Sequence, residues 1–346
     1  MLKSTGIFAL ICLLAAPLAA VGQADDGKQQ FAELGACKLA SGQQIEDCRL
    51  GYRTYGKLNA AGTNAVLFPT WFGGTTASLQ DLVSPNGLVD PAKYFVILVD
   101  ALGDGVSSSP SNSATQHGPD FPAFSMQDLV KAEYRLATET LHLKHLHAVM
   151  GISMGGQQTF EWIADYPEFM DLAIPIVGSP RPSSFDLLIY HTAIDAIQRD
   201  PDWHEGRYTG HPPMPLAESI LQMQLTSPAL YAQVHSLEDA EKEHNERFTK
   251  GILPVDANNW LAQMHAILHL DIARGGSMEE AVKSIKAKML IVNAAQDHLV
   301  NPKPALDFAK LVGAKTIVLS RDCGHVANGC EARTLNPQVR AFLDGE

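Results

Sequence analysis

A serine between two glycines is the residue of this sequence with the clearest chemistry. Residues 150–157 read MGISMGGQ, with Ser153 between Gly151 and Gly155. An apolar run typical of a strand precedes this segment, and a helical pattern follows it. In that context the GxSxG spacing predicts a strained strand-to-helix turn that exposes the serine hydroxyl. The start of the helix would place the Met154 N–H where an oxyanion forms.

A serine hydroxyl is a weak nucleophile unless a general base and an orienting acid accompany it. Asp297 follows the apolar run 289–293, and His325 follows the run 316–320. Both residues are therefore expected at the carboxyl ends of strands, where such sites are built. The chain order of serine, acid and histidine is the order found in α/β-hydrolases.

Other acids and another histidine compete for these roles. Asp322 is too close to His325 in sequence to orient it easily, and Asp271 is the second competing acid. His298 is an alternative base, but it precedes the last predicted strand instead of following it.

The second oxyanion donor is expected in the loop PTWFGGT, residues 69–75, after an early strand. We choose the Phe72 amide first and the Trp71 amide second. The side chain of Trp71 is also a candidate for substrate contact, although both aromatic rings could simply pack beneath neighbouring helices. Arg181 is a further candidate for substrate binding; the alternative is a salt bridge at a hinge.

Four cysteines outside the N-terminal segment form two close pairs, Cys37 with Cys48 and Cys323 with Cys330. The second pair encloses His325, so a zinc site and a redox-active thiol pair are alternatives to a disulfide. Structural zinc usually needs CxxC-type clusters, which are absent from the sequence, and we therefore expect two disulfides.

Two histidine clusters, at 142–147 and 265–269, have spacings that could hold a metal. No acid or thiolate clearly accompanies either cluster. We expect no metal and no cofactor.

Charge and the N-terminus limit the partners and the location. The 346-residue chain carries a formal net charge of -12, so binding to nucleic acid is not expected. Residues 1–24 combine Lys3, a short apolar run and small residues near the end, which predicts a cleavable signal peptide. An uncleaved membrane anchor is the alternative. We expect a periplasmic or secreted protein without stable membrane insertion after cleavage.

The elements that must position these residues alternate along the chain. Short apolar runs rich in β-branched residues predict parallel strands buried on both faces. They lie at 65–70, 94–100, 147–152, 172–177, 289–293 and 316–320. Helical patterns at 125–141 and 154–167 lie between them, and Ser125 and Asp128 resemble a capping box. This alternation predicts an α/β fold with a mostly parallel, doubly wound sheet.

The alternation breaks between the predicted strands at 172–177 and 289–293, where only helical patterns appear, over 185–198, 216–225 and 257–273. We expect residues 25–180 and 287–346 to form an α/β-hydrolase core and residues 181–286 a helical cap inserted into it. The alternative is a long helical section in the layer of the core.

Several segments resemble the homoserine O-acetyltransferase family of α/β-hydrolase-fold proteins. They are DPAKYFVILVDALGDGVSSSPSN, FSMQDLVKAEYRL, HAVMGISMGGQQTFEWIADYPE and SPRPSS. The family's catalytic serine, aspartate and histidine match Ser153, Asp297 and His325. The resemblance implies acyl transfer through an acyl-serine and, by analogy, a homodimer formed through the cap helices.

The sequence departs from that family at the positions that hold homoserine. Val326 replaces the aspartate that follows the catalytic histidine, and the cap arginine for the substrate carboxylate falls near Glu218. Losing each charge partner in a buried site costs about 2–5 kcal/mol. We therefore expect an exported serine hydrolase that cleaves a small ester or related acyl compound. An O-acyltransferase with unknown donor and acceptor is the alternative, and a non-catalytic binding module on the same fold is the third hypothesis.

Overall fold

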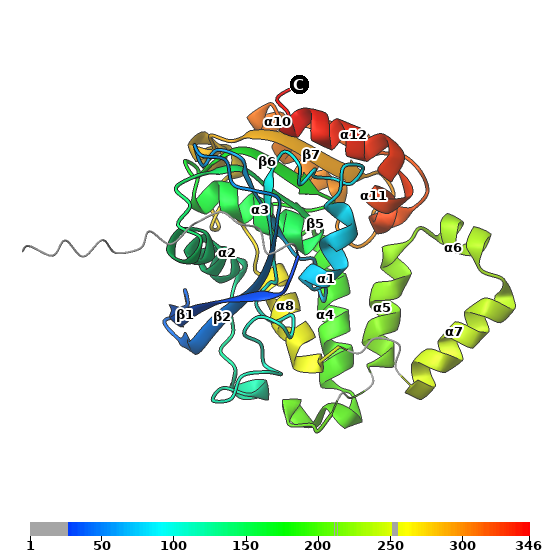
Figure 1. Cartoon of the computed structure of the whole chain (residues 1–346). Coiled ribbons are helices and arrows are strands. Elements are labelled where there is room, and N and C mark those ends of the chain that lie inside the picture. Colours follow the sequence, from blue (N-terminus) through cyan, green and yellow to red (C-terminus); the bar gives the residue numbers. More distant parts are fainter. Residues whose placement is uncertain (1–26, 211, 213, 251–254) are drawn as a thin grey trace, which may run out of the picture.

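A single mixed sheet organises the protein (Figure 1). The computed structural model describes residues 27–346 apart from 211, 213 and 251–254, so the predicted signal peptide lies outside the described residues. The eight strands of the sheet are ordered β1-β2-β4-β3-β5-β6-β7-β8. Their bounds are β1 Gln30–Lys38, β2 Gln44–Tyr55, β3 Ala65–Pro69, β4 Phe95–Val99, β5 Leu146–Ile152, β6 Met170–Ile176, β7 Lys288–Ala294 and β8 Lys315–Leu319.

The pairing within the sheet confirms the predicted α/β-hydrolase fold. Strands β3 to β8 pair in parallel, whereas β1 and β2 form an antiparallel hairpin that joins the sheet along β4. All six predicted strands are present, but β8 lies at the edge of the sheet and most of its residues are exposed, so the prediction of burial on both faces is wrong for this strand. Because the parallel strands point the same way, their carboxyl ends meet at one edge, where Ser153, Asp297 and His325 follow β5, β7 and β8.

Helices cover both faces of the sheet and close two apolar layers. Residues of α2, α3 and α10 pack in the layer on one face, and residues of α1 and α12 pack in the layer on the other. The bounds are α1 Thr76–Leu79, α2 Met126–Arg135, α3 Met154–Asp165, α10 Pro302–Val312, α11 Ala327–Cys330 and α12 Ala332–Leu343. The predicted capping box at the start of α2 forms, with Ser125 and Asp128 exchanging hydrogen bonds.

The segment between β6 and β7 is helical, as predicted. It contains α4 Ser184–Gln198, α5 Pro215–Leu225, α6 Pro228–Val234, α7 Leu237–Lys250, α8 Ala257–Leu268 and α9 Met278–Ala281. In Figure 1, α6 and α7 stand farthest from the sheet, while α4 and α8 lie beneath it. The helical pattern predicted to run to residue 273 ends at Leu268, because Asp271 accepts from the Ala273 and Gly275 amides and forms a turn there.

Both predicted disulfides are formed. Cys37 is bonded to Cys48 across the β1–β2 hairpin, and Cys323 is bonded to Cys330 in the loop after β8. The bonded sulfurs are therefore neither zinc ligands nor free thiols. Across the described ranges, no helix is long and apolar enough to cross a membrane.

Candidate active site

Ser153 lies on a strained turn between β5 and α3. Its φ of 58° and ψ of −120° fall in a region that non-glycine residues rarely adopt. The Ser153 amide donates to the Ile176 carbonyl at 2.9 Å, which ties the turn to β6. A Cβ atom at Gly151 would lie 2.2 Å from the Gly155 carbonyl, and one at Gly155 would lie 2.5 Å from the Pro69 carbonyl oxygen. The close approach of these backbones therefore explains both glycines of the motif.

The predicted base and acid lie beside this serine. The Ser153 hydroxyl is 2.8 Å from His325 Nε2, and His325 Nδ1 is 2.8 Å from Asp297 Oδ2. Because the carboxylate can only accept, Nδ1 carries the proton and Nε2 is left to accept from the serine. All three side chains are buried. The arrangement can take a proton from the hydroxyl and stabilise the resulting imidazolium.

The acid is held by its own loop and by the first helix of the insertion. Asp297 Oδ1 accepts from the Leu299 and Val300 amides at 3.0 and 2.9 Å. Asp186, in the first turn of α4, accepts from the Asn301 amide at 3.0 Å. Burial raises the pKa of Asp186. The SxxD pattern that begins at Ser183 could have identified Asp186 as part of a capping box. It could not have predicted the hydrogen bond from the Asn301 amide in the loop that carries Asp297.

The competing acids and base lie elsewhere. Asp322 is exposed, Asp271 accepts from backbone amides of its own turn, and His298 is half-buried beside the acid. The structure therefore pairs His325 with Asp297, and not with Asp322 or Asp271.

The loop after β3 lies beside the serine turn and offers two free amides. The Gly73 amide donates to Gln263 Oε1 at 2.9 Å, and the Gly74 amide donates to the Trp71 carbonyl at 3.0 Å. Within the described part of the chain, the amides of Phe72 and Trp71 have no such acceptor. They remain the candidates for the second oxyanion donor, and the amide of Met154, at the first turn of α3, remains the candidate for the first.

The aromatic side chains of this loop are packed. The Phe72 ring lies 5.1 Å from the Trp260 ring of α8, and Trp71 packs at the edge of the apolar layer beside α1 and α12. The Phe72 ring therefore packs beneath the insertion, which was the alternative to substrate contact for the aromatic side chains of this loop.

The loop that carries the base contacts the corner between α5 and α6. The Ser227 hydroxyl donates to the Asp322 carbonyl and accepts from the Leu230 amide, which caps α6. Gly324 has a φ of 67°, and a Cβ atom there would lie 2.7 Å from the Ser227 nitrogen. The insertion thus presses directly on the backbone beside His325. No sequence signal connected Ser227 to this loop.

Arg181 does not lie with these groups. Its side chain is exposed and lines a surface depression of about 500 Å³ with Phe185 and Lys303. Ser153, Asp297 and His325 do not line this depression. The position of Arg181 therefore gives no support for the predicted substrate contact.

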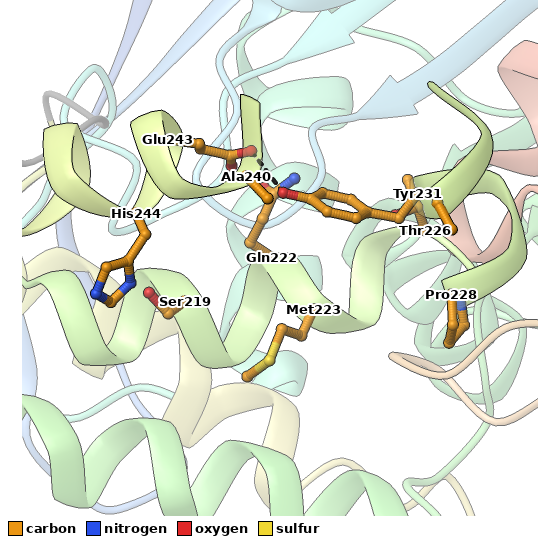
Figure 2. Close-up of a pocket in the computed structure, with 10 residues that line it drawn as sticks. Ser219, Gln222, Met223, Thr226, Pro228, Tyr231, Ala240, Glu243 and His244 are labelled. Carbon is orange, nitrogen blue, oxygen red and sulfur yellow. Dashed lines mark hydrogen bonds between the residues drawn. The ribbon is translucent and has the colours of Figure 1, made fainter. Parts of the chain in front are cut away.

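A cavity of about 440 Å³ opens between α5, α6 and α7 (Figure 2). Tyr231 crosses it and donates to Glu243 at 2.9 Å, and Met223 lies on its α5 side. Thr226 lines the cavity and also packs against Gly324, so one residue separates the cavity from the base loop. Ser153 and His325 do not line it.

The two positions that depart from the homoserine enzymes differ in exposure. Val326 is at the surface after His325, whereas Glu218 is buried on α5, a helix that packs against the base loop. Val326 has no charge with which to hold an amine, and Glu218 is an acidic residue that cannot replace an arginine.

The fold and this geometry define a class. The chain belongs to the alpha/beta hydrolase fold family, whose profile matches residues 66–329. Its homologues are homoserine O-acetyltransferases and related esterases, as the resemblance of the sequence had implied. The protein is therefore a serine hydrolase-type enzyme.

The relatives include esterases and homoserine acyltransferases. The ethyl acetate hydrolase of Pseudomonas veronii is 30% identical over 83% of this chain and 85% of its own length. The structure of the acetyl esterase MekB matches with a TM-score of 0.85 at 28% identity, over 92% of this chain and 97% of that one. The homoserine O-acetyltransferase of Bacillus anthracis matches with a TM-score of 0.84 at 26% identity, over 92% and 98%.

Proposed function

We propose that this protein is an exported esterase that cleaves small acyl esters through an acyl-serine at Ser153. The observation that carries the proposal is the hydrogen-bonded chain from Ser153 through His325 to Asp297, with both bonds at 2.8 Å. A serine aligned with a neutral imidazole that a buried carboxylate orients is the arrangement that acyl transfer requires.

The reaction has two halves. Ser153 Oγ attacks the ester carbonyl while His325 Nε2 takes its proton, and the amides of Met154 and Phe72 receive the oxyanion. The tetrahedral intermediate collapses, the ester C–O bond breaks, and His325 returns the proton to the leaving alcohol. Water then attacks the acyl-serine with His325 again as the base, which releases the carboxylic acid and restores the serine.

Two features favour a small ester and water as the acyl acceptor. The relatives include an ethyl acetate hydrolase and an acetyl esterase. Val326 and Glu218 replace the groups that would pair with an α-amino acid, so such an acceptor would lose both partners. A small neutral ester needs neither.

Labelling with a fluorophosphonate probe tests the nucleophile. Wild-type protein should be labelled on Ser153 and should release p-nitrophenol from p-nitrophenyl acetate. Ser153→Ala should lose both, while Ser284→Ala, an exposed serine in a surface turn, should keep both. Full esterase activity in folded Ser153→Ala would overturn the proposal.

Acyl transfer is the second candidate, favoured by the likeness to the homoserine O-acetyltransferase of Bacillus anthracis. Product partition separates it from hydrolysis. An esterase should send the acetyl group to water even when millimolar homoserine is present. Formation of O-acetylhomoserine as the main product would instead establish a transferase.

Export and self-association belong to the same proposal. Residues 1–24 and the two disulfides favour an oxidising compartment outside the cytosol. Exposed apolar side chains on α5 to α7, Met223 at 66%, Val234 at 60% and Leu237 at 88%, favour a homodimer through the insertion. Light scattering on the oxidised protein, compared with Leu237→Glu, tests the dimer: the variant should be monomeric.

A further inference from the structure

One side chain of the insertion is bonded to two loops of the core. Gln263 lies on α8 and is fully buried, with 0% of its surface exposed. Its Oε1 accepts from the Gly73 amide at 2.9 Å, and its Nε2 donates to the Leu102 carbonyl at 3.1 Å. A backbone N–H can only donate and a backbone carbonyl oxygen can only accept. The two partners therefore fix which way the side-chain amide of Gln263 is turned. Gln263 therefore ties the loop after β3 to the loop after β4.

A second residue of α8 holds the same loop. Trp260 stands one turn before Gln263, and its ring packs 5.1 Å from Phe72. A Cβ atom at Gly73 would lie 3.0 Å from the Trp260 indole nitrogen, and the φ of Gly73 is 66°. The Trp260 ring thus holds Phe72, and Gln263 holds the Gly73 amide. These two contacts fix the residues on either side of the Phe72–Gly73 peptide bond.

That position matters because the Phe72 amide is the proposed second oxyanion donor. An oxyanion hole works when its donors are already aimed at the developing charge, so that no reorganisation accompanies the reaction. With its hydrogen bound to Gln263, the Gly73 amide cannot turn toward the oxyanion in place of Phe72. The loop is left with one orientation relative to the Met154 amide.

We propose that Gln263 is a positioning residue for the oxyanion donor at Phe72, so that the helical insertion takes part in catalysis by holding this loop. The inference rests on the proposed esterase function and adds a role for α8 within it. It predicts that loss of the Gln263 bonds weakens binding of the transition state and leaves binding of the ground state nearly unchanged.

The test replaces Gln263 by Met, which has a similar volume and makes neither bond. Removing a whole oxyanion donor costs about 10²–10³-fold in kcat, so misplacing one should cost about 10–100-fold in kcat with KM within about twofold. Binding of a trifluoromethyl ketone, which forms an oxyanion on the serine, should weaken in parallel with kcat/KM. Active sites are counted by fluorophosphonate titration, so that misfolded protein does not lower the apparent kcat.

Asn258→Leu is the matched control. Asn258 is a buried amide on the same helix that donates to the Gly206 carbonyl and accepts from Trp203, and neither partner belongs to the oxyanion loop. This variant should lose stability while kcat per titrated site stays within about twofold of wild type. If Gln263→Met does not fold, Gln263→Leu serves, because leucine also makes neither bond; its kcat should fall at least about threefold.

An unchanged kcat per active site in the folded Gln263 variant would overturn the inference and show that the residue only stabilises the fold. Equal losses in Gln263→Met and Asn258→Leu would overturn it as well. Neither result bears on the esterase proposal, which the Ser153→Ala experiment tests separately.

Discussion

The two disulfides of this protein close loops of similar size in very different surroundings. Cys37–Cys48 spans 11 positions between two strands that are already paired, β1 and β2. Cys323–Cys330 spans 7 positions of an irregular segment made of a 3-10 turn and one helical turn. Only the second loop contains a side chain of the proposed active site. The same crosslink can therefore act on stability in one place and on catalytic geometry in the other.

The two disulfides are expected to add similar amounts to the free energy of unfolding. By the chain-entropy model, the crosslink is worth about 2.8 kcal/mol for the Cys37–Cys48 loop and about 2.5 kcal/mol for the shorter Cys323–Cys330 loop. The hairpin has further support, because Arg135 on α2 donates to the Leu34 and Ala36 carbonyls of β1. Beyond its crosslink, the base loop is held by Ser227 and by the bond from His325 to Asp297. A difference in activity between the loops must therefore come from geometry.

Removing the imidazole gives the largest expected contrast between the two loops. His325→Ala should lower kcat/KM by at least about 10³-fold, because a serine without its base is a poor nucleophile. Gln43→Ala, an exposed polar residue inside the hairpin loop, should change kcat/KM by less than twofold. Ester hydrolysis on variants of known thermal stability measures both. Comparable activity in the two variants would contradict the assignment of His325.

Opening the crosslinks gives the next largest effect. The double variant Cys323→Ser/Cys330→Ser should lose about tenfold in kcat/KM at a temperature where it is fully folded, because the imidazole gains freedom relative to Ser153. The double variant Cys37→Ser/Cys48→Ser should lose a similar amount of stability and keep its activity. Thermal unfolding and kinetics on the same samples measure the two quantities. Equal activity in the two double variants would make both disulfides purely structural.

Ser227 offers a smaller test of how the base loop is held. Ser227→Ala removes the cap of α6 and the bond to the Asp322 carbonyl, whereas Ser277→Ala removes only the cap of α9. Each loss of a cap should cost about 1 kcal/mol of unfolding free energy. Only Ser227→Ala should also lower kcat, by about threefold. If Ser277→Ala lowered kcat equally, the contact with the base loop would have no catalytic role.

The smallest effect on activity is expected from replacing Glu133, which lies on α2, the helix that supports the β1–β2 hairpin. Burial raises the pKa of this carboxyl to about 8, against the opposing effect of the hydrogen bond from Trp162. Between about pH 4.5 and 8 the folded state keeps a proton that the unfolded state releases, so stability falls as pH rises. Thermal unfolding across that window should show a slope that Glu133→Gln flattens, with kcat unchanged. Parallel slopes in the two proteins would exclude Glu133 as the cause.

Much of the fold could be predicted from local patterns. Six strands appear as apolar runs, although β8 at the edge of the sheet is mostly exposed, and the capping box of α2 and the break at the insertion are visible in the sequence. The sequence pattern does not indicate α6 and α7, because α7 is predominantly polar and α6 is only seven residues long. The helical pattern at 257–273 extends beyond the end of α8 at Leu268, since the turn at Asp271 depends on side-chain bonds that periodicity does not show.

The sequence by itself determined the residues that meet around Ser153. Each follows a strand of one parallel sheet, and the carboxyl ends of such strands must share an edge. Only the tertiary structure decided what holds them there. Gln263 and Ser227 lie in the insertion, about 190 and 95 positions from Gly73 and Asp322, the residues that they bind. Contacts of that range arise from how helices pack across the sheet, and no local pattern of residue types encodes them.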